Sequence, residues 1–520
     1  MMRMAGMNAA DIGVIVAYLA GLVTFGLLVS RRQSGAESYF LASHGVTWPI
    51  IGLALLASTI SPTALIGITG SAYGLGISVF NYEWVASLVL ILFAIAFLPT
   101  IIRARVFTVP EFLERRFGRP TRLWFAAMSL LLGMLLDAAG LYGGALVLCR
   151  AVPAVSVQSA VAILAILAGG YAVSGGLKSV MYTQSVQAIA VLAAACMVSL
   201  IVFDRAGGLA HVLETADPHK LSLIRPASDP AMPWTGLLLG APVLSFYFWC
   251  TNQSMVQRML AARSLRDAQL GALFAGVLKL LILPVIVLPG IAAILLFPEL
   301  ERPDGAYPAM MFELLPTGLL GFVLAAFAGA LLAQLSTAYI TTGTLLAMDV
   351  VRVVKSTTDE VMLVRWGRAG TLASMIFSVF WAPQIARFPS LWQYLQAVLA
   401  YVTPPVVALF LVGLMWRGAS SRGAIAALIA GNLVGLCLFG AAVAGVWDFH
   451  FLHAAALLLL VSSAALIIGS VLMADRSAIA GSGRDRQGVG WFVWERPRLD
   501  VSLWAVALLL LTISIVFWLR

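Results

Sequence analysis

The sequence predicts an all-α protein that crosses a membrane many times, and three observations lead to this fold class. First, 61% of the 520 residues are hydrophobic and only 11% are charged, which lies far outside the composition of a soluble domain. Second, apolar stretches of about 20 residues, the length that spans a bilayer, recur along the whole chain. Third, most of the 32 lysine and arginine residues lie in every second loop, and an excess of these residues is typical of cytoplasmic loops.

We expect about 14 spans, at 12–30, 48–74, 77–101, 122–148, 154–174, 181–203, 233–256, 270–297, 314–347, 366–385, 391–415, 421–446, 451–473 and 501–519. The basic loops place both termini outside, and we expect the membrane to be the cytoplasmic (inner) membrane of a bacterium. The first stretch is followed by Arg31-Arg32 and is long enough to be a retained span rather than a signal peptide. The net charge of +9 is spread over loops, so the expected partner is the lipid bilayer, and neither nucleic acid nor a soluble protein is indicated.

The second span is interrupted in its middle by Ser61-Pro62-Thr63. Proline has no N–H to donate, and its ring clashes with the preceding helical turn. A break inside hydrocarbon is tolerated where protein or a water-filled cavity satisfies the freed backbone groups. Unwound carbonyls at the bilayer midplane are typical of transporters that hold a small cation or a polar solute. The break therefore indicates a transporter.

Two loops have a character of their own. In Val106–Gly118, Pro110 stands at the expected start of a short amphipathic helix at the cytoplasmic interface. Residues 475–498 are rich in glycine, serine and arginine and are typical of a flexible linker to a detached last span. The four cysteines lie in or beside apolar segments without paired spacing, which predicts neither a disulfide framework nor a metal site.

Three ionisable side chains lie inside the predicted spans, where a charge is costly and usually functional. They are Glu83, Asp137 and Lys279. Glu83 and Lys279 are either a structural ion pair or a polar site for the hydroxyl groups of a solute. Asp137 is either a buried structural carboxyl or a proton carrier. Tyr82, beside Glu83, could stack on a sugar ring.

The ninth span is rich in small and hydroxyl residues, which close helix packing explains without a ligand. Gln334 on this span must find a polar partner or line a cavity. The five histidines lie in loops or near span ends, and no metalloprotease, P-loop or serine-hydrolase motif is present. The protein is therefore not expected to be an enzyme.

Several sequence blocks together resemble the solute:sodium symporter family, in particular its sodium/glucose branch, from about Glu37 to the last span. The blocks are Ile66-Gly67, Gly70-Ser71-Ala72-Tyr73, Tyr82-Glu83-Trp84, Thr108–Gly118, Gly175-Gly176-Leu177, Asn252-Gln253, Gln257-Arg258, Leu260-Ala261-Ala262, Leu288–Ala293 and Met348-Asp349.

The resemblance implies a LeuT-type core of two inverted five-helix repeats around a midplane site. The expected layout is a first helix and cytoplasmic loop (1–47), a first repeat (48–203), an extracytoplasmic loop (204–232), a second repeat (233–415) and peripheral helices (416–520).

The resemblance also implies solute-binding residues. Glu83, Lys279 and Gln396 match polar sugar contacts, Tyr82 matches an aromatic neighbour, and Phe248 stands where the family's inner gate has a tyrosine. Thr59, Ala64, Ala86 and Ser245 replace longer or more polar contacts. The implied solute is smaller than glucose or galactose, or differently decorated.

The implied sodium site has changed more. Family members bind Na⁺ through backbone carbonyls, here those of Ala57, Ile60 and Ala330, and through two hydroxyl side chains of the ninth span. Those two positions are Ala333 and Gln334 here, and a nearby family aspartate is Gln184. Sodium prefers oxygen ligands, which alanine lacks. Asp137 occupies a position that is usually neutral in the sugar branch.

We therefore expect a secondary active importer of a sugar or sugar derivative that works by alternating access, with a degraded sodium site. The alternatives are a proton-coupled or uncoupled transporter, with Asp137 as the proton site, and a solute sensor that does not transport. No cofactor is expected apart from Na⁺ as a coupling ion.

Overall fold

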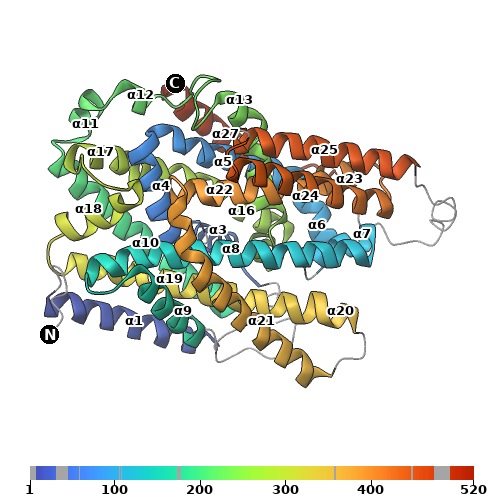
Figure 1. Ribbon diagram of the computed structural model, residues 1–520, viewed down its shortest axis with the longest axis horizontal. Coiled ribbons are helices and arrows are strands. Elements are labelled where there is room, and N and C mark those ends of the chain that lie inside the picture. Colours follow the sequence, from blue (N-terminus) through green and yellow to red (C-terminus); the bar gives the residue numbers. More distant parts are fainter. Residues whose placement is uncertain are drawn as a thin grey trace.

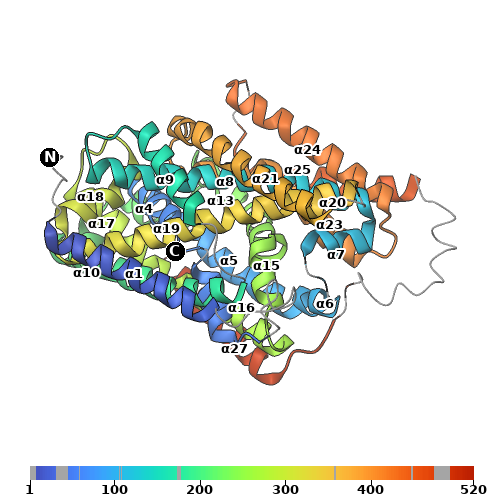
Figure 2. The ribbon, with the colours of Figure 1, turned by 90° about the horizontal axis from the view of Figure 1, so that it is seen from below.

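The computed structural model describes residues 8–30, 45–57, 59–104, 106, 108–171, 177–355, 359–446, 449–472, 492 and 494–519. Within these residues the chain is helical, with only two isolated β-bridges. Most of the long helices run along the long axis of the molecule (Figures 1 and 2). In both views α18 (Ala306–Leu314) lies near one end, and α7 (Val109–Phe117) and α20 (Arg352–Val354) lie near the other.

Ten helices of the described chain are long and apolar enough to cross a membrane, and two bent helix pairs raise this number to 12. Two further apolar segments, Ala9–Leu22 and Val157–Gly170, are shorter. The helices therefore coincide with the predicted apolar stretches. The number of spans that cross the bilayer and the side of the termini stay predictions.

The helices from the first broken span onward fall mainly into two groups, within residues 48–203 and 233–415, and the assignment of these two ranges to inverted repeats stays a prediction. The first group contains α3 (Trp48–Ala57), α4 (Pro62–Leu75), α5 (Asn81–Leu92), α6 (Leu98–Arg103), α8 (Arg119–Ala151), α9 (Val157–Tyr171) and α10 (Leu177–Arg205). The second group contains α13 (Trp234–Leu239), α14 (Ala241–Phe246), α15 (Gln253–Leu260), α16 (Leu265–Leu280), α17 (Leu288–Leu296), α19 (Leu319–Thr344), α21 (Glu360–Trp381), α22 (Leu391–Val402) and α23 (Pro404–Met415). Short 3-10 or π segments continue several of them, among them η4 (Tyr247–Thr251) and η7 (Leu345–Val351).

The break predicted at Pro62 is confirmed. Helix α3 ends at Ala57, α4 begins at Pro62, and the two axes differ by 62°. Ser61 caps α4, because its Oγ accepts a hydrogen bond from the Ala64 N–H at 3.2 Å. Pro62 occupies the first turn, where an N–H would have no helical partner. Among the described residues, no hydrogen bond reaches the carbonyl of Ala57 or Ile60.

A second interruption lies at Asn252, between η4 and α15. Asn252 has an extended backbone conformation, with φ −66° and ψ 125°, and its Oδ1 accepts from the Ser254 N–H at 2.9 Å. This asparagine therefore ends one helix and caps the next. Each group of helices thus begins with an interrupted helix, and both interruptions border one cavity, the larger of the two described below.

The short helix expected in Val106–Gly118 is also confirmed, as α7. The Oγ1 of Thr108 accepts from the Glu111 N–H at 3.1 Å, and Gly118 ends the helix with a φ of 93°. One face of α7 is buried and the other carries charged residues. Next to it, Arg122 of α8 donates to Asp349 in η7 at 2.7 and 2.9 Å, which ties α8 to the end of α19.

Four helices surround these two groups: α1 (Ala9–Ser30), α24 (Ser421–Val443), α25 (Phe451–Leu472) and α27 (Leu499–Trp518). Helix α1 is fastened to α19 through the buried Asp11, whose Oδ1 accepts from the N–H groups of Gly318 and Gly321 at 2.7 and 2.9 Å. A carboxylate is favourable at this helix N-terminus. Glu37, Gly175-Gly176 and most of the linker 475–498 lie outside the described residues.

Candidate functional site

A cavity of about 160 Å³, the Glu83 cavity, lies beside the break between α3 and α4. Helices α4, α5, α14, α16, α19 and α22 contribute to its wall. The lining residues are Thr59, Ser61, Thr63, Ala64, Tyr82, Glu83, Ala86, Leu136, Leu244, Ser245, Phe248, Trp249, Lys279, Gln334, Trp392, Leu395, Gln396 and Leu399. A cavity of this volume has room for several water molecules, which suits a small solute.

Glu83 and Lys279 meet in this cavity as an ion pair. Their residues are 2% and 5% exposed, so the pair is almost completely buried. Glu83 stands in the first turn of α5, and Lys279 stands in the last turn of α16. The Lys279 Nζ also lies 5.7 Å from the centre of the Trp249 ring, within the range of a cation–π contact.

Aromatic rings and an amide complete the wall. The rings of Tyr82 and Trp392 pack edge to face, with centres 6.0 Å apart. Gln396 follows Trp392 by about one turn of α22 and is 7% exposed. Every residue predicted to bind the solute therefore lines the same cavity: Glu83, Lys279, Gln396, Tyr82, Phe248, Thr59 and Ser245. Their role in binding stays a prediction.

Sequence reasoning missed four of the polar and aromatic lining residues, namely Ser61, Thr63, Trp249 and Trp392. Thr63 and Ser61 flank the proline of the broken helix, and Trp249 follows Phe248, so proximity in the sequence was a usable signal for these three. Trp392 lies one helical turn before the predicted Gln396, so the i, i+4 spacing on α22 was the usable signal for it.

A second cavity of about 210 Å³, the Asp137 cavity, contains the residues of the implied sodium site. Its lining includes Ala57, Ile60, Ala330, Ala333, Gln334 and Gln184. Leu136, Phe248 and Gln334 border both cavities and so form the partition between them. Phe248 thus lies between the Glu83 cavity and the Asp137 cavity, at the position where the family resemblance implies a gate.

The side chains at the positions of the implied sodium site differ from the ligands that the family resemblance implies. Ala333 offers no side-chain oxygen, and Gln334 offers one amide oxygen where a hydroxyl is expected. At the acidic position, the Oε1 of Gln184 accepts a hydrogen bond from Arg258 at 2.9 Å. Arg258 is 5% exposed, and no described carboxylate pairs with it. A buried guanidinium in the same cavity repels a second cation.

Asp137 lines this second cavity and not the first. It is 5% exposed, and the Oγ of Ser374 on α21 donates to its Oδ2 at 3.3 Å. No described lysine or arginine pairs with Asp137. The sequence suggested no partner for Asp137, and in the structure its carboxyl group accepts a hydrogen bond from a neutral hydroxyl beside a cavity.

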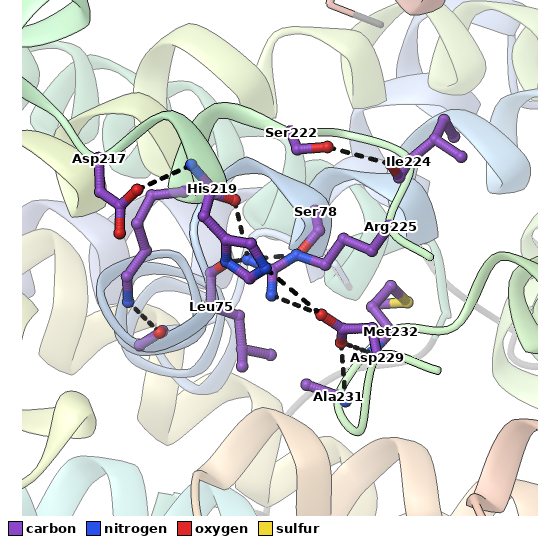
Figure 3. Close-up of polar contacts among 12 residues, drawn as sticks. Leu75, Ser78, Asp217, His219, Ser222, Ile224, Arg225, Asp229, Ala231 and Met232 are labelled. Atoms are coloured by element: carbon purple, nitrogen blue, oxygen red, sulfur yellow. Dashed lines mark hydrogen bonds and ion pairs between the residues drawn. The ribbon is translucent and has the colours of Figure 1, made fainter. Parts of the chain in front are cut away.

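The loop after α10 clamps the end of α4 (Figure 3). Lys220 donates to the carbonyls of Tyr73 and Gly74, and Arg225 donates to the carbonyl of Leu75. Arg225 also donates to Asp229 at 3.1 Å. Cations are favourable at a helix C-terminus, where the last carbonyls have no helical partner. Gly76, with a φ of 83°, lies directly against the Lys220 backbone and leaves no room for a side chain.

Asp304 fastens the start of α22 near the same end of the molecule. Both of its carboxylate oxygens lie 3.1 Å from the Leu391 N–H, which donates to them, and Arg302 lies 3.7 Å away. Burial raises the pKa of Asp304 to about 6, and the Leu391 N–H and Arg302 offset this only in part.

The raised pKa of Asp304 predicts a pH-dependent stability. The folded state binds this proton more tightly than the unfolded chain does. The protonated carboxyl group therefore stabilises the fold fully below about pH 4, and this stabilisation is lost as the pH rises to about 6. Asp304→Asn should remove this loss, which amounts to roughly 3 kcal/mol. Melting temperatures of the detergent-solubilised variant and wild type between pH 4 and 7.5 test this, with exposed Asp217→Asn as control. Parallel profiles for Asp304→Asn and wild type would contradict the prediction.

With this geometry, comparison with known proteins becomes informative. The sequence matches the Sodium:solute symporter family over residues 39–431. The sodium/glucose cotransporter of Vibrio parahaemolyticus is 31% identical, over 82% of this chain and 84% of the relative. The sodium/mannose cotransporter of Bos taurus is 32% identical, over 90% and 87%. Sodium/myo-inositol cotransporter 2 of Oryctolagus cuniculus is 32% identical, over 82% and 69%.

Solved structures agree on the fold. A Na⁺-coupled sialic acid symporter aligns with a TM-score of 0.76 at 20% identity, over 89% of this chain and 98% of that chain. The transporter Mhp1 aligns with a TM-score of 0.51 at 13% identity, over 85% and 96%. The predicted LeuT-type fold is confirmed, and the protein is a multi-pass membrane transporter rather than an enzyme. By its sequence and its fold, the chain belongs to the sodium:solute symporter family.

Proposed function

We propose that this protein imports a sugar or sugar derivative by alternating access, and that sodium coupling is weakened or lost. The proposal rests chiefly on the buried Glu83–Lys279 pair, which lines a small cavity at the break of the α3–α4 span. A carboxylate accepts hydrogen bonds from hydroxyl groups, and an ammonium donates to them. A buried charge pair that faces a cavity is favourable only when its remaining hydrogen-bonding capacity is used, and hydroxyl groups of a solute can use it.

In the proposed transport cycle, the solute binds between this pair and the rings of Tyr82 and Trp392. Phe248 then forms the barrier toward the Asp137 cavity, so a movement of this ring would open the path between the two cavities. Rigid-body rocking of one helix group against the other would expose each side in turn. We place the protein in the cytoplasmic membrane of a bacterium.

Weakened sodium coupling is supported by the donor set. Alanine at position 333 removes one ligand, Gln184 removes an acidic charge, and Arg258 adds a buried cation to the same cavity. Proton coupling through Asp137, or transport without coupling, would take its place. Asp137 favours the proton version, because it is buried beside the cavity and has no cationic partner among the described residues.

A binding screen tests the proposal. Thermal shift of the purified protein is measured with a library of sugars and sugar acids, in sodium chloride and in choline chloride at the same pH. We expect at least one solute to stabilise the protein equally in both salts. A stabilisation that requires sodium would contradict weakened coupling. Absence of any sugar-like ligand, together with no counterflow of these solutes in proteoliposomes, would contradict the proposed function.

A further inference from the structure

Besides Glu83 Oε2, which is paired with Lys279, three polar side-chain atoms of residues that line the Glu83 cavity are buried without a hydrogen-bond partner in the described part of the chain. They are Thr63 Oγ1, Gln334 Oε1 and Trp392 Nε1. Unsatisfied buried polar atoms are rare in folded proteins, and each calls for an explanation. Thr63 is 4% exposed, so its hydroxyl cannot turn to solvent. Three such atoms around one cavity indicate a ligand that would satisfy them.

Gln334 reaches this cavity from α19, where the family resemblance implies a cation ligand. A serine at this position would be shorter, whereas the amide extends far enough to border both cavities. Gly140 of α8 lies beside it. A Cβ atom at Gly140 would lie 3.5 Å from Thr63 Oγ1 and 3.8 Å from Gln334 Nε2. The hydroxyl of Thr63 and the amide of Gln334 therefore gather over the same glycine.

The charges of the cavity limit the kind of ligand. Glu83 and Lys279 neutralise each other, and no other charged side chain lines the cavity among the described residues. An acidic solute would have to compete with Glu83 for Lys279, and it would bring an unpaired charge into a buried site. Threonine and glutamine side chains can each donate and accept, and the Trp392 indole donates. These groups match several hydroxyls on an uncharged ring.

We propose that Gln334 is a solute ligand rather than a cation ligand, and that it selects neutral polyhydroxylated rings such as monosaccharides and cyclitols. Together with Thr63 and Trp392 it forms a second polar edge of the site, in addition to Glu83 and Lys279. The inference rests on the proposed function, because it assigns a substrate class to the same cavity. The inference also connects the altered sodium site with the altered solute site, because the residue that replaces a sodium ligand contributes to solute recognition.

The test uses full-length wild type and two variants of α19. Gln334→Met keeps the length of the side chain and removes its hydrogen bonds. Thr337→Val is the matched control, because Thr337 lines only the Asp137 cavity and its hydroxyl donates to the Ala333 carbonyl at 2.7 Å. Binding of D-glucose, D-galactose, D-mannose, myo-inositol and D-glucuronate is measured by calorimetry and thermal shift in choline chloride, and again in sodium chloride.

We expect wild type to bind at least one of the four neutral rings, and to bind D-glucuronate at least about tenfold more weakly. Gln334→Met should weaken that neutral ligand at least about tenfold in both salts, because a buried partner is lost. Thr337→Val should stay within about twofold of wild type.

Three outcomes would overturn the inference. The first is a Gln334→Met variant that binds the solute as tightly as wild type in choline chloride but loses an increase in affinity that wild type shows in sodium chloride. This result would make Gln334 a cation ligand. Tighter binding of D-glucuronate than of every neutral ring would exclude the neutral class. Binding of some other solute from the wider screen, but of none of the neutral rings, would overturn this inference and leave the proposed transport function standing.

Discussion

Lys279→Met should abolish solute binding and strongly lower the melting temperature of the purified protein. The substitution leaves Glu83 as a buried charge without its partner, and removal of one member of a buried pair typically costs about 3–5 kcal/mol. Glu83→Gln should have an effect of similar size. Binding of the solute identified by the screen and thermal unfolding in detergent measure the two effects.

The double variant Glu83→Gln/Lys279→Met separates a structural role of the pair from a functional one. Without either charge, no buried ion lacks a partner, so the double variant should be more stable than either single variant. It should still fail to bind the solute, because the ammonium donors and the carboxylate acceptors are both gone. Recovery of stability together with normal binding would show that the pair only fixes the packing of α5 against α16.

A matched control is available at the protein surface. Arg150 and Glu313 also form an ion pair, but their side chains are 52% and 42% exposed. Exposed pairs contribute about 0–1 kcal/mol. Arg150→Gln should therefore change neither binding nor melting temperature appreciably. An equal destabilisation by Arg150→Gln and Lys279→Met would mean that burial does not determine the effect.

Arg225→Gln should destabilise the clamp at the end of α4, and this is the second large effect that we expect. Arg225 and Asp229 have side chains that are 5% and 6% exposed, and Arg225 also satisfies the carbonyl of Leu75 (Figure 3). The variant leaves the buried Asp229 carboxylate without its arginine partner and the Leu75 carbonyl without its donor. We expect a lower melting temperature and weaker solute binding, because α4 carries Thr63 and borders the cavity.

The pH dependence of the clamp provides an independent check. Although burial raises the pKa of Asp229, the N–H groups of Met232 and Ala231 and the charge of Arg225 outweigh it and keep the pKa below its usual value of 3.8. A lowered pKa contributes stability above 3.8 that is lost as the pH falls through the folded-state pKa. Arg225→Gln should reduce this contribution, so its melting temperature should fall less steeply with acidification than that of wild type.

Lys220→Gln is the matched variant for the clamp. Lys220 donates to the neighbouring carbonyls of Tyr73 and Gly74, but it is only half-buried and pairs with no described carboxylate. Its loss leaves no buried charge behind, so its effect should be clearly smaller than that of Arg225→Gln. Equal effects of the two substitutions would mean that the Arg225–Asp229 pair adds nothing to the capping of α4.

Much of the architecture is predictable because its causes are local in the sequence. A stretch of about 20 apolar residues is helical in a bilayer because only a helix satisfies its own backbone groups there. The break at Pro62 follows from a missing N–H, and the start of α7 follows from Thr108 and Pro110. The inverted-repeat fold was inferred from sequence blocks that resemble a family, since periodicity alone does not encode the order in which helices pack.

The sequence by itself therefore determined the membrane class, the position of the broken span and the three ionisable residues to suspect. Tertiary structure alone decided which of them meet. Glu83 and Lys279 form a pair because α5 packs on α16, whereas Asp137 faces Ser374 and a separate cavity. It also placed the unsatisfied atoms of Thr63, Gln334 and Trp392 around one cavity. The physical reason is that propensity and hydrophobicity act over one or two helical turns, whereas a binding site is formed by side chains from helices that are distant in the sequence.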